Sequence, residues 1–119
     1  MKPVRLGIAG AGIAALQVLP HLAALADVRR DNMEFFCERH GAAVPMFDSV
    51  EAMCRSPEVD AVWVASPNAL HAEHTILAAK NGKHVICEKP MAVTLEQCQA
   101  MVEAVERHGI KFVQGHSKA

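Results

Sequence analysis

Tyrosine is absent from this 119-residue chain, and Trp63 is its single tryptophan. A core with so few aromatic side chains has to be built from small aliphatic residues, and alanine and valine dominate the apolar set. Such residues suit thin β-strands covered by helices better than an aromatic-rich sandwich or barrel. The composition therefore favours an α/β fold, and the length fits one domain, residues 1–119.

An excess of either charge is also lacking, since 12 basic residues stand against 13 acidic ones. The two signs are interspersed, which gives no support to nucleic-acid or anionic-membrane binding. No apolar run approaches the roughly 18 residues of a membrane span, and no signal-peptide pattern precedes the first apolar run. We therefore expect a cytoplasmic protein that binds neither nucleic acid nor membrane.

Metal-binding patterns are missing as well. The four cysteines show no Cys-x-x-Cys spacing and are expected to be reduced thiols. His71 and His74 stand three residues apart on a predicted helix, yet no cysteine or carboxylate pair completes a four-ligand site. We predict no metal site, and we expect the two histidines to cap the helix or contact solvent.

What is present is an alternation of short β-like runs and helical stretches, which is typical of parallel βαβ units. Glycines at 41, 82 and 109 follow three of the predicted helices, where a left-handed C-cap is needed. Thr94 and Gln97 form a capping-box pattern before the last helix. Strands are predicted at 4–9, 43–47, 61–65, 84–87 and from 111. Helices are predicted at 13–22, at 31–40, after 48, after 68 to about 81, and at 95–108.

The string Gly10-Ala11-Gly12-Ile13-Ala14-Ala15 directly follows the first predicted strand and opens a helix. In such a G-x-G-x-x-A turn the first glycine permits the tight turn and the second lets the backbone approach a pyrophosphate. The helix N-terminus then offers unpaired N–H groups to the anion. The turn predicts dinucleotide binding, although S-adenosylmethionine enzymes use similar loops. The predicted contacts are Gly10, Ala11, Gly12, Ile13 and Ala14.

An acidic residue about twenty positions further on is expected to hold the adenosine ribose, and Asp27 is the candidate. The spacing is short for a full helix followed by a full strand. Residues 22–26 therefore form a stunted second strand, or the second strand is missing. Asp27 can alternatively be a solvated surface acid. Arg29 and Arg30 can instead accept the 2′-phosphate of NADP, so the choice between NAD and NADP stays open.

With Ser66-Pro67-Asn68, His71 and Glu88-Lys89-Pro90 downstream of the glycine turn, the chain resembles the Gfo/Idh/MocA family of NAD(P)-dependent oxidoreductases from residue 4 to 116. The resemblance implies a Rossmann-type, doubly wound parallel sheet. The ending Gly115-His116-Ser117 resembles dihydrodiol dehydrogenases of aromatic-acid catabolism.

The resemblance also implies roles for individual residues. Asn68 and His71 would lie near the cofactor's ribose, in the loop after the fourth strand formed with Ser66 and Pro67. In the Glu88-Lys89-Pro90 turn, Lys89 would be the catalytic residue near the reacting hydroxyl and the nicotinamide. Glu88 would contact the cofactor, and Pro90 would fix the turn. Both segments follow predicted strands, where ligands of open α/β sheets bind.

A second domain follows the Rossmann domain in that family and carries substrate residues and oligomer contacts. No such domain is present in these 119 residues, so we expect negligible turnover by this chain alone. The resemblance implies a longer enzyme, a homo-oligomer, that acts on a hydroxyl or carbonyl of a sugar-like or cyclic diol substrate. The alternative is a non-catalytic fragment or partner-dependent module that binds no nucleotide.

Overall fold

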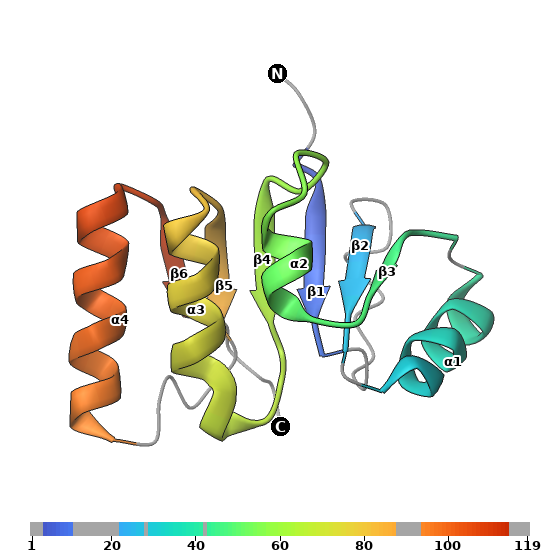
Figure 1. Ribbon diagram of the computed structural model, residues 1–119, viewed down its shortest axis with the longest axis horizontal. Coiled ribbons are helices and arrows are strands. Elements are labelled where there is room, and N and C mark those ends of the chain that lie inside the picture. The colour runs from blue at the N-terminus through green and yellow to red at the C-terminus, as the bar shows by residue number, and fades with distance from the viewer. Residues whose placement is uncertain (1–3, 11–21, 28, 42, 88–93, 115–119) are drawn as a thin grey trace.

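The computed structural model describes residues 4–10, 22–27, 29–41, 43–87 and 94–114 (Figure 1). Six parallel strands form one sheet in the order β3-β2-β1-β4-β5-β6. This is the strand order of a doubly wound Rossmann sheet, in which the chain reverses its direction of travel beside the first strand. The predicted Rossmann-type parallel sheet is thus confirmed. The strands are Leu6–Ala9 (β1), Leu22–Ala26 (β2), Met46–Phe47 (β3), Ala61–Val64 (β4), His84–Cys87 (β5) and Phe112–Gln114 (β6).

The second strand corrects the expectation that it would be shortened or missing. β2 has five residues, against four in β1, and pairs with all of β1. The spacing argument assumed strands of about 18 Å, whereas four residues span only about 13 Å. A crossover of about nine helical residues covers that length, and twelve positions separate β1 from β2. The short spacing is therefore compatible with a complete βαβ unit.

The described helices are Arg30–His40 (α1), Val50–Cys54 (α2), His71–Lys80 (α3), which follows the short 3-10 turn Asn68–Leu70, and Leu95–His108 (α4). Gly41 and Gly109 adopt the left-handed conformation predicted at the ends of α1 and α4. The capping box of Thr94 and Gln97 also forms. Within the described part of the chain, no helix has the length and apolar character of a membrane span.

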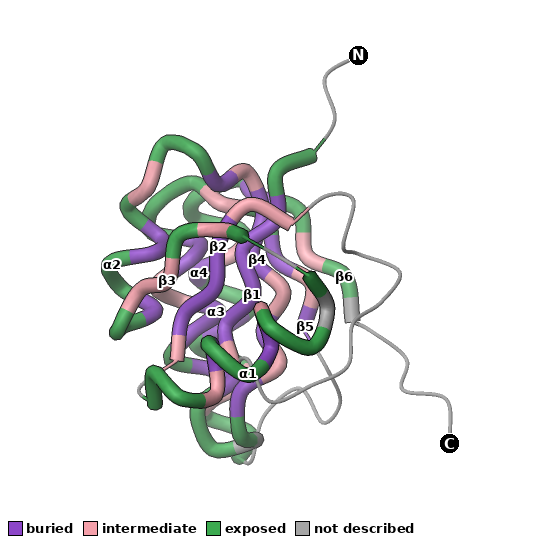
Figure 2. The backbone as a smooth tube through the Cα atoms, turned by 90° about the vertical axis from the view of Figure 1, so that its right-hand side faces the viewer, coloured by how far each residue is buried: buried purple, intermediate pink, exposed green. Residues whose placement is uncertain are grey.

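The core has two layers because successive side chains of a strand point to opposite faces of the sheet. Ala24 and Ala26 of β2 join a cluster with residues of α2, α3 and α4, which lie side by side across the sheet in Figure 1. Leu25 points the other way and packs with Ile8, Met33 and Phe36, the last two from α1. Figure 2 shows the resulting burial of β1, β2 and β4 between exposed helical surfaces.

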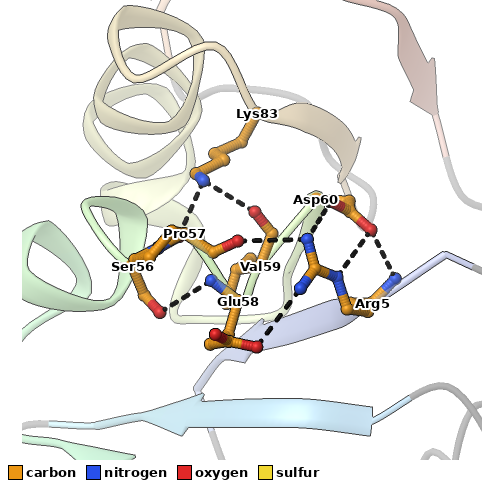
Figure 3. A network of polar contacts seen from close by, with 7 residues as sticks. All are labelled: Arg5, Ser56, Pro57, Glu58, Val59, Asp60 and Lys83. Atoms are coloured by element: carbon orange, nitrogen blue, oxygen red, sulfur yellow. Dashed lines mark hydrogen bonds and ion pairs between the residues drawn. The ribbon is translucent and has the colours of Figure 1, made fainter.

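At the amino edge of the sheet, polar contacts tie the segment before β4 to its neighbours (Figure 3). The guanidinium of Arg5 donates to both carboxylate oxygens of Asp60, and also to Glu58. Lys83 Nζ donates to the carbonyl oxygens of Ser56 and Val59, at 2.8 and 2.6 Å. These contacts lie at the edge opposite to the carboxyl ends of the strands, so we assign them to the scaffold.

We expect Lys83→Met to lower the free energy of unfolding by about 1.5–3 kcal/mol, because charge-assisted hydrogen bonds to two carbonyls are lost while the aliphatic stem is kept. Chemical denaturation measures the change. Lys80→Met, at the exposed C-terminal turn of α3, is the matched control and should cost less than about 1 kcal/mol. Equal effects of the two variants would show that the Lys83 contacts do not stabilise the fold.

Candidate functional site

A pocket of about 800 Å³ opens at the carboxyl edge of the sheet. This size lies within the range of small-molecule and cofactor sites. Residues that follow β1, β2 and β4 form its inner wall, and the starts of α2 and α3 form its sides. In Figure 1 the arrowheads of these strands point to this edge. Its lining includes Gly10, Asp27, Arg29, Asn32, Glu51, Ser66, Pro67, Glu73 and His74.

Gly10 directly follows β1 at the centre of this edge and has a φ of 98°. A Cβ on this residue would lie 2.9 Å from the carbonyl oxygen of Ala65 and from both the N and Cα of Ser66. All three are backbone atoms that cannot turn aside, so only glycine fits. The Gly10 N–H also donates to the carbonyl of Ala26, at 2.9 Å. The first glycine of the turn is therefore required by the contact between the β1 and β4 loops.

Asp27 comes directly after β2 and lines the pocket. Its Oδ1 accepts the backbone N–H of Arg29 at 2.9 Å, and its Oδ2 accepts the side-chain amide of Asn32 at 3.3 Å. These donors fix the carboxylate, and an ionised carboxylate can accept further hydrogen bonds. Asp27 is partly buried at the end of the second strand, which is where a ribose-binding acid is found in Rossmann domains.

The loop after β4 is held from behind by two histidines of α3. His71 Nε2 donates to the carbonyl oxygen of Ser66 at 2.7 Å, and His74 Nδ1 is hydrogen-bonded to the Ser66 hydroxyl at 2.6 Å. All three residues are buried. The expectation that the histidines would contact solvent is wrong, because the first turn of α3 packs them against this loop. Ser66, Pro67 and His74 line the pocket, and His71 fixes the loop.

Burial lowers the pKa of His74 below its ordinary value of 6.5; nearby His71 lowers it further and Glu73 opposes the change. His74 therefore binds a proton more tightly in the unfolded chain than in the folded one. Neutral His74 contributes fully to the free energy of unfolding above about pH 6.5, and this contribution is lost as the pH falls through the lowered pKa of the folded state.

We expect the free energy of unfolding to decrease as the pH is lowered from 7 to 5, and His74→Leu to reduce that dependence. Urea titrations at several pH values measure both slopes. If the free energy of unfolding of the His74→Leu variant changes with pH as it does in the wild type, groups other than His74 cause the pH dependence.

Several predicted contacts lie outside the described residues: Ala11, Gly12, Ile13, Ala14, Glu88, Lys89 and Pro90. For Asn68 the structure describes only the backbone, in the 3-10 turn before α3. β5 ends with Cys87, level with Val64 of β4, at the same edge as the pocket.

Described residues include no cluster of three metal-ligating side chains. Burial raises the pKa of the Cys54 thiol to about 11, which makes it unreactive.

Comparison with known proteins adds to this geometry. A family model described as "Oxidoreductase family, NAD-binding Rossmann fold" (GFO_IDH_MocA) matches residues 4–116. A 1-carboxy-3-chloro-3,4-dihydroxycyclohexa-1,5-diene dehydrogenase of Comamonas testosteroni is 36% identical over 96% of this chain and 30% of its own length.

Solved structures show the same relation. An NAD-binding oxidoreductase from Klebsiella pneumoniae superposes with a TM-score of 0.83 at 32% identity, over 96% of this chain and 34% of that one. A variant of a 3-ketoreductase from Actinomadura kijaniata, in complex with TDP-benzene and NADP, superposes with a TM-score of 0.83 at 30% identity, over 96% of this chain and 37% of that one. The chain thus spans about a third of the length of these relatives.

Proposed function

Because the chain belongs to the Gfo/Idh/MocA oxidoreductase family, with its NAD-binding Rossmann fold, we propose that it is the dinucleotide-binding domain of a longer NAD(P)-dependent oxidoreductase. The observation that carries the proposal is the convergence of Gly10, Asp27 and Ser66-Pro67 on one pocket at the carboxyl edge of the sheet. These residues follow three neighbouring strands, where open α/β sheets bind their ligands.

The residues present fit a dinucleotide. Because Gly10 has no side chain, the turn after β1 packs closely against the loop after β4. Residues 11–14 would offer their backbone to the pyrophosphate. Asp27 would accept hydrogen bonds from the adenosine ribose, and Ser66, Pro67, Asn68 and His71 would place the loop beside the rest of the cofactor. The nicotinamide, when bound, would give or take the hydride.

Residues 88–90 would complete the site. Lys89 would orient the substrate oxygen, stabilise negative charge that develops on it and assist proton transfer. Glu88 would contact the cofactor and Pro90 would fix the turn. The support for these roles is the family membership together with the end of β5 at Cys87, on the pocket edge of the sheet.

The proposed substrate class is a sugar-like or cyclic diol with a reacting hydroxyl or carbonyl group. Its support comes from relatives named for such compounds, a D-glucoside 3-dehydrogenase of Escherichia coli and an inositol 2-dehydrogenase of Paracoccus denitrificans. Because this chain spans about a third of those proteins, we propose that the remaining substrate-binding residues and the oligomer contacts lie in the other two thirds. Turnover by these 119 residues alone would then be negligible.

Calorimetric titration of the 119-residue chain with NADH and NADPH tests the cofactor proposal. We expect saturable binding of at least one of them at sub-millimolar concentration, with a matching rise in melting temperature. S-adenosylmethionine is the negative control and should not compete. If neither dinucleotide binds or raises the melting temperature, the proposal is wrong and the chain is better described as a non-binding fragment.

A further inference from the structure

Ser66 and His74 face each other at the wall of the pocket. The Ser66 hydroxyl lies 2.6 Å from His74 Nδ1, and the two residues are only 7% and 8% exposed. Both also line the pocket at the carboxyl edge of the sheet. The hydroxyl is therefore one of the polar groups that a bound ligand would meet, and an imidazole ring sets its hydrogen-bonding state.

The two histidines of α3 act on Ser66 in different ways. His71 Nε2 contacts the Ser66 carbonyl oxygen, which can only accept, so this nitrogen carries a hydrogen. His74 contacts the hydroxyl, which can either donate or accept. The contact with His71 thus fixes the backbone of the loop, whereas the contact with His74 fixes where the single hydroxyl proton points.

The geometry indicates that Ser66 is the donor in this hydrogen bond. A separation of 2.6 Å lies within the range of hydroxyl donors and is shorter than N–H donors usually give. The His74 ring is neutral near pH 7, because burial lowers its pKa, so one of its two nitrogens can accept. With its proton directed to Nδ1, the Ser66 oxygen presents only lone pairs to the pocket.

We propose that His74 is a positioning residue for the dinucleotide, because it makes the Ser66 hydroxyl a fixed hydrogen-bond acceptor. Such an acceptor matches the hydrogen-bond donors of the cofactor, which are its hydroxyl and amide groups, and not the phosphate oxygens, which are themselves acceptors. A hydroxyl that is already oriented also loses little rotational freedom when the ligand binds. The inference rests on the proposed function and adds His74 to the residues that place the cofactor.

A double-mutant cycle tests whether His74 acts through Ser66. Calorimetry measures the NADH affinity of the 119-residue chain as wild type, Ser66→Ala, His74→Leu and the double variant, at a temperature where melting curves show all four to be folded. We expect each single change to weaken binding by about 3- to 10-fold, the effect of one ordered side chain. The double variant should bind within about twofold of Ser66→Ala, because both changes remove the same interaction.

His74→Asn separates this role from packing. The asparagine amide oxygen can take the place of Nδ1 and accept the Ser66 proton, so NADH affinity should return to within about twofold of the wild type. His108→Leu, at the exposed end of α4, is the matched control and should leave the affinity unchanged. ADP-ribose, which lacks the nicotinamide, identifies the donor: the same losses point to a ribose hydroxyl, and their absence points to the nicotinamide amide.

Nitrogen NMR of the His74 ring checks the direction of the hydrogen bond, because it distinguishes a bare Nδ1 from one that carries a hydrogen. We expect a bare Nδ1 at neutral pH, and a hydrogen on this atom would overturn the acceptor role of Ser66. Additive losses in the cycle, or a His74→Asn chain that binds as weakly as His74→Leu, would show that His74 does not act through Ser66. If the wild-type chain itself does not bind NADH or NADPH, the proposed function is refuted instead.

Discussion

Gly10→Ala is expected to reduce NADH affinity by more than tenfold and to lower the free energy of unfolding by about 2–4 kcal/mol. The new Cβ would meet three backbone atoms of Ala65 and Ser66 at 2.9 Å, and the φ of 98° disfavours any L side chain. The β1 and β4 loops would have to separate, and both form the wall of the pocket. Calorimetric titration with NADH and urea denaturation measure the two effects.

Gly41→Ala is the matched control. Gly41 also has a positive φ, of 64°, but no atom lies within 4 Å of the place where its Cβ would be. This variant should lose only about 1 kcal/mol and should bind NADH like the wild type. If Gly10→Ala equals Gly41→Ala in both stability and affinity, the close contact between the loops has no consequence for the site.

The sequence alone was sufficient for elements whose local pattern agrees with their surroundings. The apolar run at 61–65 is too short for a helix and predicts a strand covered on both faces, and residues 84–87 predict the next strand. The structure has strands at both places, β4 and β5. Likewise, Gly41 and Gly109 end their helices as predicted, because the left-handed cap depends on the chain within one turn.

β2 shows where local information fails. Its sequence, Leu-Ala-Ala-Leu-Ala, consists of two of the strongest helix formers, yet it is a strand because β1 and β3 pair with its two edges. Tertiary pairing overrides propensity in such a segment. The length argument also underestimated this strand, because it rested on a first strand longer than the four residues of β1.

The candidate site was predictable only in part for the same reason. Gly10 and Asp27 follow strands in positions that a general rule identifies. The partners of His71 and His74 are set by how α3 packs against the loop after β4, and no spacing in the sequence shows that packing. The pairing of Arg29 with Asp31 is also invisible to a pattern, because Arg29 has several acidic neighbours in the sequence.

His71→Leu carries the second large expected effect, a loss of about 1–3 kcal/mol of unfolding free energy together with weaker dinucleotide binding. Leucine would still fill the buried space, but it cannot donate to the carbonyl oxygen of Ser66, which His71 Nε2 contacts at 2.7 Å. The loop that carries Ser66 and Pro67 forms one wall of the pocket, so its displacement should reach the cofactor. Denaturation and NADH titration measure both consequences.

The comparison with His71→Gln separates hydrogen bonding from packing. The glutamine amide can donate to the same carbonyl and should restore part of both the stability and the affinity. His108→Leu, at the exposed end of α4, makes the same replacement far from the loop and should change stability by less than about 1 kcal/mol. If leucine and glutamine at position 71 behave alike, the ring only fills space and the donated hydrogen bond does not fix the loop; recovery with glutamine alone means that the bond to Ser66 holds the pocket wall in place.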